Sequence, residues 1–199
     1  MGPIDFDAIP GYREACDNEQ ANWNLAVLPL PVPLCGISVF QLMPRHVVLL
    51  TYCGNPFIAG GRTPDFADIA FFLWVVSTEY CLDLKKRDKF VKNWIKRNRA
   101  CQPIKEISAY IERAYQDAPG SGGVGRVQYY APAIYFIDLF GVEYGWSPEQ
   151  TMNTPLATIY QLLKAIKRRY NPKAIQFNST DGLRSRILRD QMMPPTGEN

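Results

Sequence analysis

The sequence predicts a mainly α-helical protein: one domain over residues 1–199, with about seven or eight helices, an extended proline-rich strap and at most one short hairpin. Three observations predict it. The chain has 199 residues, which fits one large domain. Apolar residues make up 47%, enough for a sizeable buried core. Helix-starting and helix-ending residues bracket most segments, and nothing repeats at a fixed period, which argues against a solenoid.

The N-terminal third predicts one helix, the strap and a strand. Gly11–Asn24 is the expected helix. In Leu25–Leu34 (LAVLPLPVPL), proline fixes φ and removes backbone donors, so this piece is extended and cannot be a central strand. We favour a stiff strap across the core over an arm that docks on a partner. Gly36–Leu42 is a short strand that can pair with part of the strap.

Two apolar helices follow. Pro44 is a good first helical residue, and Pro44–Tyr52 is ended by Gly54 and Pro56. Asn55–Arg62 is expected to be a loop. Thr63-Pro64-Asp65 provides a cap, a proline and an early acid for a helix over Asp65–Glu79, which is nearly all apolar. Such a helix lies centrally or in an interface.

The remaining chain predicts further helices, separated by Pro and Gly. They are Leu84–Arg99, Ile104–Gln116, Pro132–Tyr144, a short turn from Trp146-Ser147-Pro148-Glu149, a helix from Thr154-Pro155 to Tyr170, and a last short helix over Asn178–Asp190. Residues 118–126 predict a flexible loop, and residues 191–199 a polar tail.

The sequence offers no catalytic apparatus. It has a single histidine, His46, which rules out metal sites with two or more histidines. No nucleophile elbow lies near His46, so we expect a core or helix-surface side chain. Asp138, in an apolar helix, is expected to be buried beside a partner such as an arginine. We therefore predict that the protein is not an enzyme.

Two further sequence patterns resemble ligand sites, but their sequence context does not fit such sites. Gly120–Gly125 matches G-x-G-x-x-G, but no strand precedes it and no P-loop lysine follows. A flexible turn is the better interpretation.

The five cysteines are widely spaced, so we interpret them as small buried hydrophobes in a reducing compartment: Cys16, Cys35, Cys53, Cys81 and Cys101. No cofactor or metal is predicted.

Membrane insertion is not expected. The longest uncharged stretch, Leu25–Met43, contains three prolines, and no basic signal-peptide start precedes Asp5 and Asp7.

The strongest local feature is the basic amphipathic segment Leu84–Arg99. It has one acidic residue, Asp88, and eight basic ones: Lys85, Lys86, Arg87, Lys89, Lys92, Lys96, Arg97 and Arg99. Its net charge is therefore +7, and because the whole chain carries +3, the remainder carries −4. Phe90, Val91, Trp94 and Ile95 fall on one helical face.

Several roles fit this basic helix. The plainest is a solvated face whose lysine stems cover the core. Binding to an acidic protein surface comes next, followed by contact with nucleic acid. A second basic cluster, Lys164 with Lys167–Arg169, complements a helix C-terminus and needs no partner.

Two stretches resemble small chaperone-like proteins from the tail-assembly region of tailed bacteriophages. The first, Leu28–Trp74, runs from the strap through Cys35-Gly36-Ile37, Met43-Pro44-Arg45-His46 and Asn55-Pro56-Phe57-Ile58 to the apolar tryptophan helix. The second runs from Tyr144-Gly145-Trp146-Ser147 through Thr154-Pro155-Leu156 to Lys167. Together they cover about half of the chain.

The resemblance implies an assembly factor in the host cytoplasm that holds tail-tube or tape-measure subunits. Such a chaperone needs binding surfaces rather than an active site. The candidate partner-binding residues are Phe57, Phe72, Trp74, Phe90 and Trp94, with the eight basic residues of the helix. The alternatives are a structural component of the virion, such as a head–tail connector, and a nucleic-acid-binding adaptor that uses residues 84–99.

Overall fold

The computed structural model describes residues 5–28, 30–97, 101–118, 132–173, 180 and 183–184. Within these ranges the chain is mainly helical, with nine α-helices, a short 3₁₀ turn and one two-stranded hairpin, so the predicted fold class is confirmed. The predicted flexible loop beyond Ala118 and the polar tail lie outside the described residues. So does almost all of the predicted last helix.

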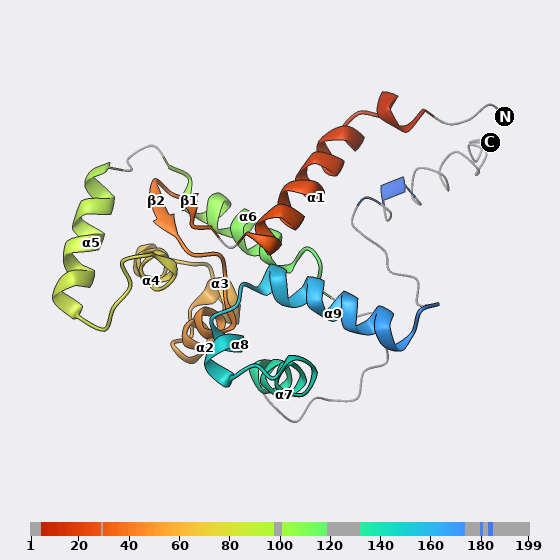
Figure 1. Ribbon diagram of the computed structural model, residues 1–199. Helices are drawn as coiled ribbons and strands as arrows, with labels where there is room; N and C mark the ends of the chain where they lie inside the picture. Colours follow the sequence, from red (N-terminus) through yellow and green to blue (C-terminus); the bar gives the residue numbers. More distant parts are fainter. Residues whose placement is uncertain are drawn as a thin grey trace.

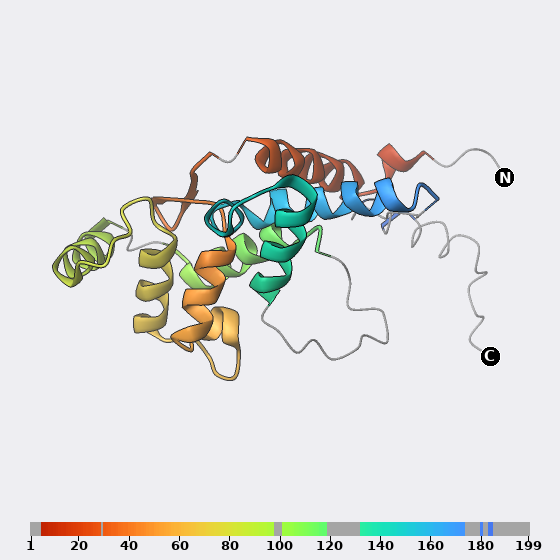
Figure 2. The same cartoon turned by 60° about the horizontal axis from the view of Figure 1, so that its bottom comes forward.

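The helices surround a single hydrophobic core (Figures 1 and 2). α1 packs against α9, and the two helices diverge from each other in Figure 1, while α4 and α5 form the opposite end of the molecule in both views. The elements are the 3₁₀ turn Phe6–Ala8, α1 Tyr12–Val27, β1 Val32–Leu34, β2 Ile37–Val39, α2 Pro44–Tyr52, α3 Pro56–Ala59, α4 Phe66–Val76, α5 Leu84–Arg97, α6 Pro103–Tyr115, α7 Pro132–Tyr144, α8 Pro148–Met152 and α9 Leu156–Tyr170.

The proline-rich strap is shorter than expected. α1 continues to Val27, so the first three strap residues are helical. The end of the strap forms β1, which pairs antiparallel with β2 as the sequence suggested. Pro33 lies opposite Ser38, and a proline is tolerated because both strands of a two-stranded sheet are edge strands.

α4 is the central helix, which confirms the expectation from its apolar composition. Seven of its residues are buried: Ile69, Ala70, Phe72, Leu73, Trp74, Val75 and Val76. It ends at Val76, three residues before the predicted end. The chain then turns extended, because Ser77 forms a β-bridge with Val39 and the Phe40 N–H donates to the Val76 carbonyl at 2.9 Å. The hairpin is thereby attached to α4.

The segment predicted as a loop after Tyr52 contains the one-turn helix α3, so that prediction was wrong. Asn55 is the reason. Its side-chain oxygen accepts from the Phe57 N–H at 3.2 Å, as an N-cap, and Pro56 occupies the first helical position. The Asn55 Nδ2 atom also donates to the Asp68 carbonyl at 2.9 Å, which joins α3 to α4.

We expect Asn55→Ala to lower the free energy of unfolding by about 1–3 kcal/mol, because the change removes a cap and leaves buried backbone groups without a partner. Asn55 is only 2% exposed, so water cannot replace the lost contacts in the folded chain. Chemical denaturation measures the loss. The exposed Asn93→Ala is the matched control, expected within about 0.5 kcal/mol of wild type. Equal stabilities for the two variants would contradict the capping role.

Candidate functional site

One face attaches α5 to the rest of the protein. Phe90 and Trp94 are buried, with their rings 5.1 Å from Trp74 and 5.9 Å from Phe66, centroid to centroid. The Trp94 Nε1–H also donates to the Cys35 carbonyl at 3.1 Å. These contacts fix how α5 is rotated about its axis, and therefore which side chains point outward.

The opposite face of α5 carries a row of lysines. Lys85, Lys89, Lys92 and Lys96 are spaced by four, three and four residues, so they fall within about 60° of one another around the helix. We call them the lysine stripe. All four are exposed, and none forms a salt bridge with another residue that the structure describes.

The first turn of α5 has a side-chain cap and also carries exposed positive charge. Asp83 begins α5, because its side chain accepts from the Lys85 N–H at 2.9 Å and the Lys86 N–H at 3.4 Å. Lys86 is exposed, whereas Arg87 is paired with its neighbour Asp88 at 3.2 Å. Most of the positive charge is thus free to act on a partner.

A shallow hollow of about 380 Å³ runs between α4 and α5. We call it the α4–α5 groove. Its lining combines apolar and charged side chains: Phe66, Ala67, Ala70 and Phe71 from α4, and Arg87, Asp88, Val91 and Lys92 from α5. Phe66 is 54% exposed, an unusual position for a phenylalanine. Lys92 belongs to both the groove and the lysine stripe, so the two features form one surface.

The aromatic candidates from the sequence lie mostly in the core, which corrects the expectation that they contact a partner. Phe72 is 0% exposed and Trp74 is 3% exposed, and Phe90 and Trp94 are buried as described above. Phe57 is half-buried against Phe72, with the ring centroids 5.3 Å apart. Periodicity alone could not separate a core helix from an interface helix, since both are apolar on all sides.

The basic candidate residues, unlike the aromatic ones, do not lie in the core where the structure describes them. The lysines of α5 are on the surface as expected. The Arg97 side chain and all of Arg99 lie outside the described residues. The sequence missed Phe66 as a surface residue, although Phe66 directly follows the helix cap Asp65, where the first turn of a helix is often open to solvent.

Two members of the second basic cluster, Lys164 and Arg169, form salt bridges within the chain that the sequence did not predict. Lys164 forms a salt bridge with Asp117, and Arg169 reaches Glu143 at 3.0 Å and lies over the Tyr144 ring. These contacts tie α9 to α7 and to the end of α6. Their charges are therefore less available to a partner than those of α5.

His46 is a core residue with a structural role. It is 3% exposed, and its Nδ1 atom accepts from the Met43 N–H at 3.3 Å at the start of α2. Burial and the neighbouring Arg45 lower the pKa of His46 to about 3. The ring is therefore neutral near pH 7 and is committed to capping α2.

Asp138 is exposed on α7, which corrects the expectation that it is buried beside a basic partner. An exposed carboxylate in a helix is an ordinary solvated group. It does not have the desolvated surroundings that tune a catalytic acid.

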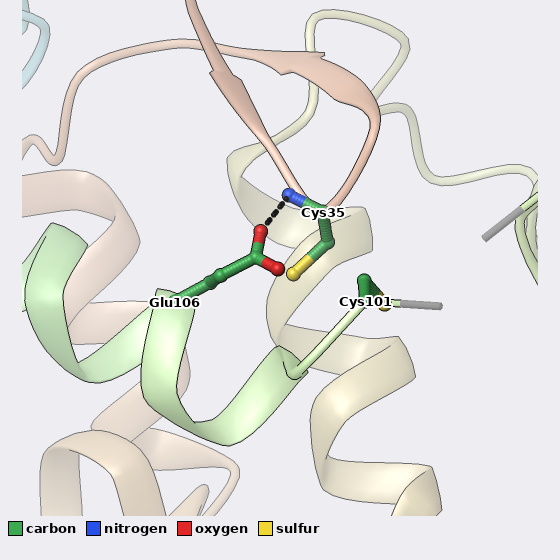
Figure 3. Close-up of side chains that lie close together, drawn as sticks. All are labelled: Cys35, Cys101 and Glu106. Atoms are coloured by element: carbon green, nitrogen blue, oxygen red, sulfur yellow. Dashed lines mark hydrogen bonds between the residues drawn. The ribbon is translucent and has the colours of Figure 1, made fainter. Parts of the chain in front are cut away.

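The cysteines are less uniformly buried than predicted. Only Cys35 is buried, while Cys53 is exposed and the other three are intermediate. Cys35 and Cys101 lie beside Glu106, and one ligand atom from each lies within 4.8 Å of the other two (Figure 3). Burial and the Glu106 carboxylate raise the pKa of the Cys35 thiol, so it is protonated in the absence of a cation.

A second hollow, of about 570 Å³, lies among α2, α6, α7 and α9. Its lining includes Val47, Val48, Tyr52 and Phe136. Among the described residues its lining is mostly apolar, with the hydroxyl-bearing side chains of Thr51, Tyr52, Tyr115 and Tyr160 and no charged side chain.

Within the described ranges, no helix is both long and apolar enough to span a bilayer. No protein-family model, curated protein or solved structure matches this chain.

Proposed function

We propose that the protein is a non-enzymatic assembly factor that binds an acidic, amphipathic segment of a structural protein through the lysine stripe and the α4–α5 groove. One observation carries the proposal. Four exposed lysines lie on the outer face of α5, and one of them, Lys92, also lines the α4–α5 groove, which contains the exposed Phe66. A surface with both features suits a partner with carboxylates beside apolar side chains.

Charge segregation supports this surface as a docking site. Residues 84–99 carry +7 while the rest of the chain carries −4, and α5, the described part of this segment, lies at one end of the molecule in Figure 1. A concentrated field steers an acidic partner to the correct face and raises the association rate. Each exposed charge pair contributes only about 0.2–1 kcal/mol, so several lysines must act together.

The groove favours a protein partner over a nucleic acid. A phosphate backbone gains little from the apolar side chains of Phe66, Phe71 and Val91, and the Asp88 carboxylate in the lining repels it. An acidic amphipathic helix can instead place apolar side chains in the groove and its carboxylates against Lys92 and Lys89.

The resemblance to phage tail-assembly proteins supplies the kind of partner. We propose that the segment belongs to a tail-tube or tape-measure subunit, which the protein holds in the host cytoplasm until assembly. An assembly factor of this kind needs no active site. This agrees with a neutral His46 that caps α2 and with an Asp138 that is exposed to solvent.

Affinity capture from phage-infected host cells tests the proposal. The wild-type chain is expected to retain a tail structural protein, identified by mass spectrometry. The variant K85Q/K89Q/K92Q should retain at most about a tenth as much, because it removes three charges from the stripe while keeping good helix formers. The control K167Q/R168Q/K173Q removes three exposed charges elsewhere and should retain as much as wild type.

Two outcomes would overturn the proposal. Equal capture by both triple variants would show that α5 is not the docking surface. Presence of the protein in purified virions at a fixed copy number would identify a structural component, such as a connector, instead of an assembly factor.

A further inference from the structure

We infer that Cys35, Cys101 and Glu106 form a zinc-binding site, with two thiolates and one carboxylate as protein ligands and water in the fourth position. The site joins the tip of the β1–β2 hairpin to the beginning of α6 (Figure 3). It is separate from the lysine stripe and does not depend on the proposed function.

The ligand set and its spacing fit this metal. Zinc in proteins takes four ligands in a tetrahedron, chiefly thiolates, imidazoles and carboxylates. Zinc–sulfur and zinc–oxygen bonds of about 2.3 and 2.1 Å place neighbouring ligand atoms about 3.4–3.8 Å apart. The three atoms here already lie within 4.8 Å of one another, so movements of about 1 Å would complete the site.

The backbone at Cys35 presents its thiol at a cost in conformational energy. Cys35 and Gly36 both have positive φ, 48° and 71°, as the two-residue turn of this hairpin requires. Glycine and asparagine are the usual residues in that conformation, and Cys35 is the one non-glycine residue with positive φ among those described. A strained residue whose side chain points at two other ligand groups fits a functional role.

Backbone donors already hold the carboxylate in place. Glu106 accepts from the Cys35 N–H at 2.9 Å and from the Gln102 N–H at 3.2 Å, one bond to each oxygen. The Cys35 carbonyl is held in turn by the Trp94 indole at 3.1 Å. Outer hydrogen bonds of this kind orient the ligands of zinc sites. Cys101 and Glu106 are partly exposed, which leaves a path for the ion and room for a water.

Binding is balanced by proton release. Zn²⁺ displaces one proton from each thiol, forms two zinc–sulfur bonds and one zinc–oxygen bond, and leaves a site with a net charge of about −1. No oxidation state changes. The cross-link would connect residues that are 66 and 71 positions apart in the sequence. Because the three ligands meet only in the folded chain, zinc binding would add directly to the free energy of unfolding.

Titration of the reduced, metal-free protein with Co²⁺, followed by displacement with Zn²⁺, tests the site. We expect one Co²⁺ per chain, with the near-ultraviolet charge-transfer band of cobalt bound to thiolates, which Zn²⁺ abolishes. The key variant is Cys35→Asn, because asparagine suits the turn and should leave the metal-free fold intact. It should bind Co²⁺ at least about 100-fold more weakly, since loss of a direct ligand exceeds the loss of an outer partner.

Cys101→Ser should show the same loss, while Cys53→Ser, which removes an exposed thiol elsewhere, should bind like wild type. Thermal melting of Cys35→Asn without metal checks that it folds, and added Zn²⁺ should raise the melting temperature of wild type but not of this variant. The inference is overturned if wild type shows no thiolate–cobalt band, or if Cys35→Asn retains the band at the same stoichiometry.

Discussion

Phe72→Ala is expected to lower the free energy of unfolding by about 3–5 kcal/mol, because the change removes a large ring from a closely packed core. Phe72 is 0% exposed in the middle of α4. Its ring lies 5.3 Å from Phe57 and 6.1 Å edge-on from Tyr110, centroid to centroid, so it connects α3, α4 and α6. Denaturant unfolding of the purified variant measures the loss.

Phe66→Ala is the matched control on the same helix. Because Phe66 is 54% exposed and contacts the fold through Trp94, its loss should reduce stability by only about 1 kcal/mol. The same variant should weaken partner binding, since the ring lines the α4–α5 groove. Similar stability losses for the two variants would contradict the assignment of one ring to the core and the other to the surface.

The second large effect is acid sensitivity from His46. The folded-state pKa of about 3 lies below the value of about 6.5 expected in the unfolded chain. Between these values the unfolded chain binds a proton that the folded chain does not. The stabilisation is therefore complete above pH 6.5 and is lost as the pH falls toward 3. Between pH 7 and pH 4.5 the contribution of His46 to the free energy of unfolding should fall by about 2–3 kcal/mol.

His46→Gln isolates this effect, because the chain has no other histidine. Glutamine at this position of a helix can still accept from the Met43 N–H, as in a capping box, but it does not titrate. Denaturant unfolding at pH 7 and pH 4.5 should show a smaller acid-induced loss in the variant by about 2–3 kcal/mol. An identical loss in both proteins would show that the carboxylates, not His46, cause the acid sensitivity.

Most helices could be predicted because their boundaries are determined by residues close to them in the sequence. Pro44 and Ser147 were expected to start helices, by the geometry of a proline and of a cap, and the structure places helix starts there. Before α4 the expected cap was Thr63, but the N-cap is Asp65, whose side chain accepts from the Asp68 N–H, so the helix begins at Phe66. The α3 turn was missed because its signal, Asn55 before Pro56, also fits a plain loop. The end of α4 was missed because Ser77 pairs with Val39, a contact 38 residues away in sequence that no local pattern contains.

The candidate site also has a part that local sequence could predict and parts that depend on tertiary contacts. The lysine stripe could be predicted from spacing alone, since it depends only on helical geometry. The α4–α5 groove could not, because it depends on which sides of α4 and α5 meet. Local sequence likewise gave no sign that Cys35 and Cys101 meet at Glu106. The hairpin turn and the start of α6 come together only in the folded chain.

The proposed binding of an acidic structural protein to α5 can be measured with purified proteins. The most direct measurement is the dissociation constant of the purified captured protein for wild type and for K85Q/K89Q/K92Q, with random-sequence duplex DNA titrated in parallel. We expect the variant to bind the protein about 10- to 100-fold more weakly, from the loss of three charge pairs of about 0.5–1 kcal/mol each, and wild type to bind DNA more weakly than the protein. Equal dissociation constants for the two chains, or tighter lysine-dependent binding to DNA, would contradict it.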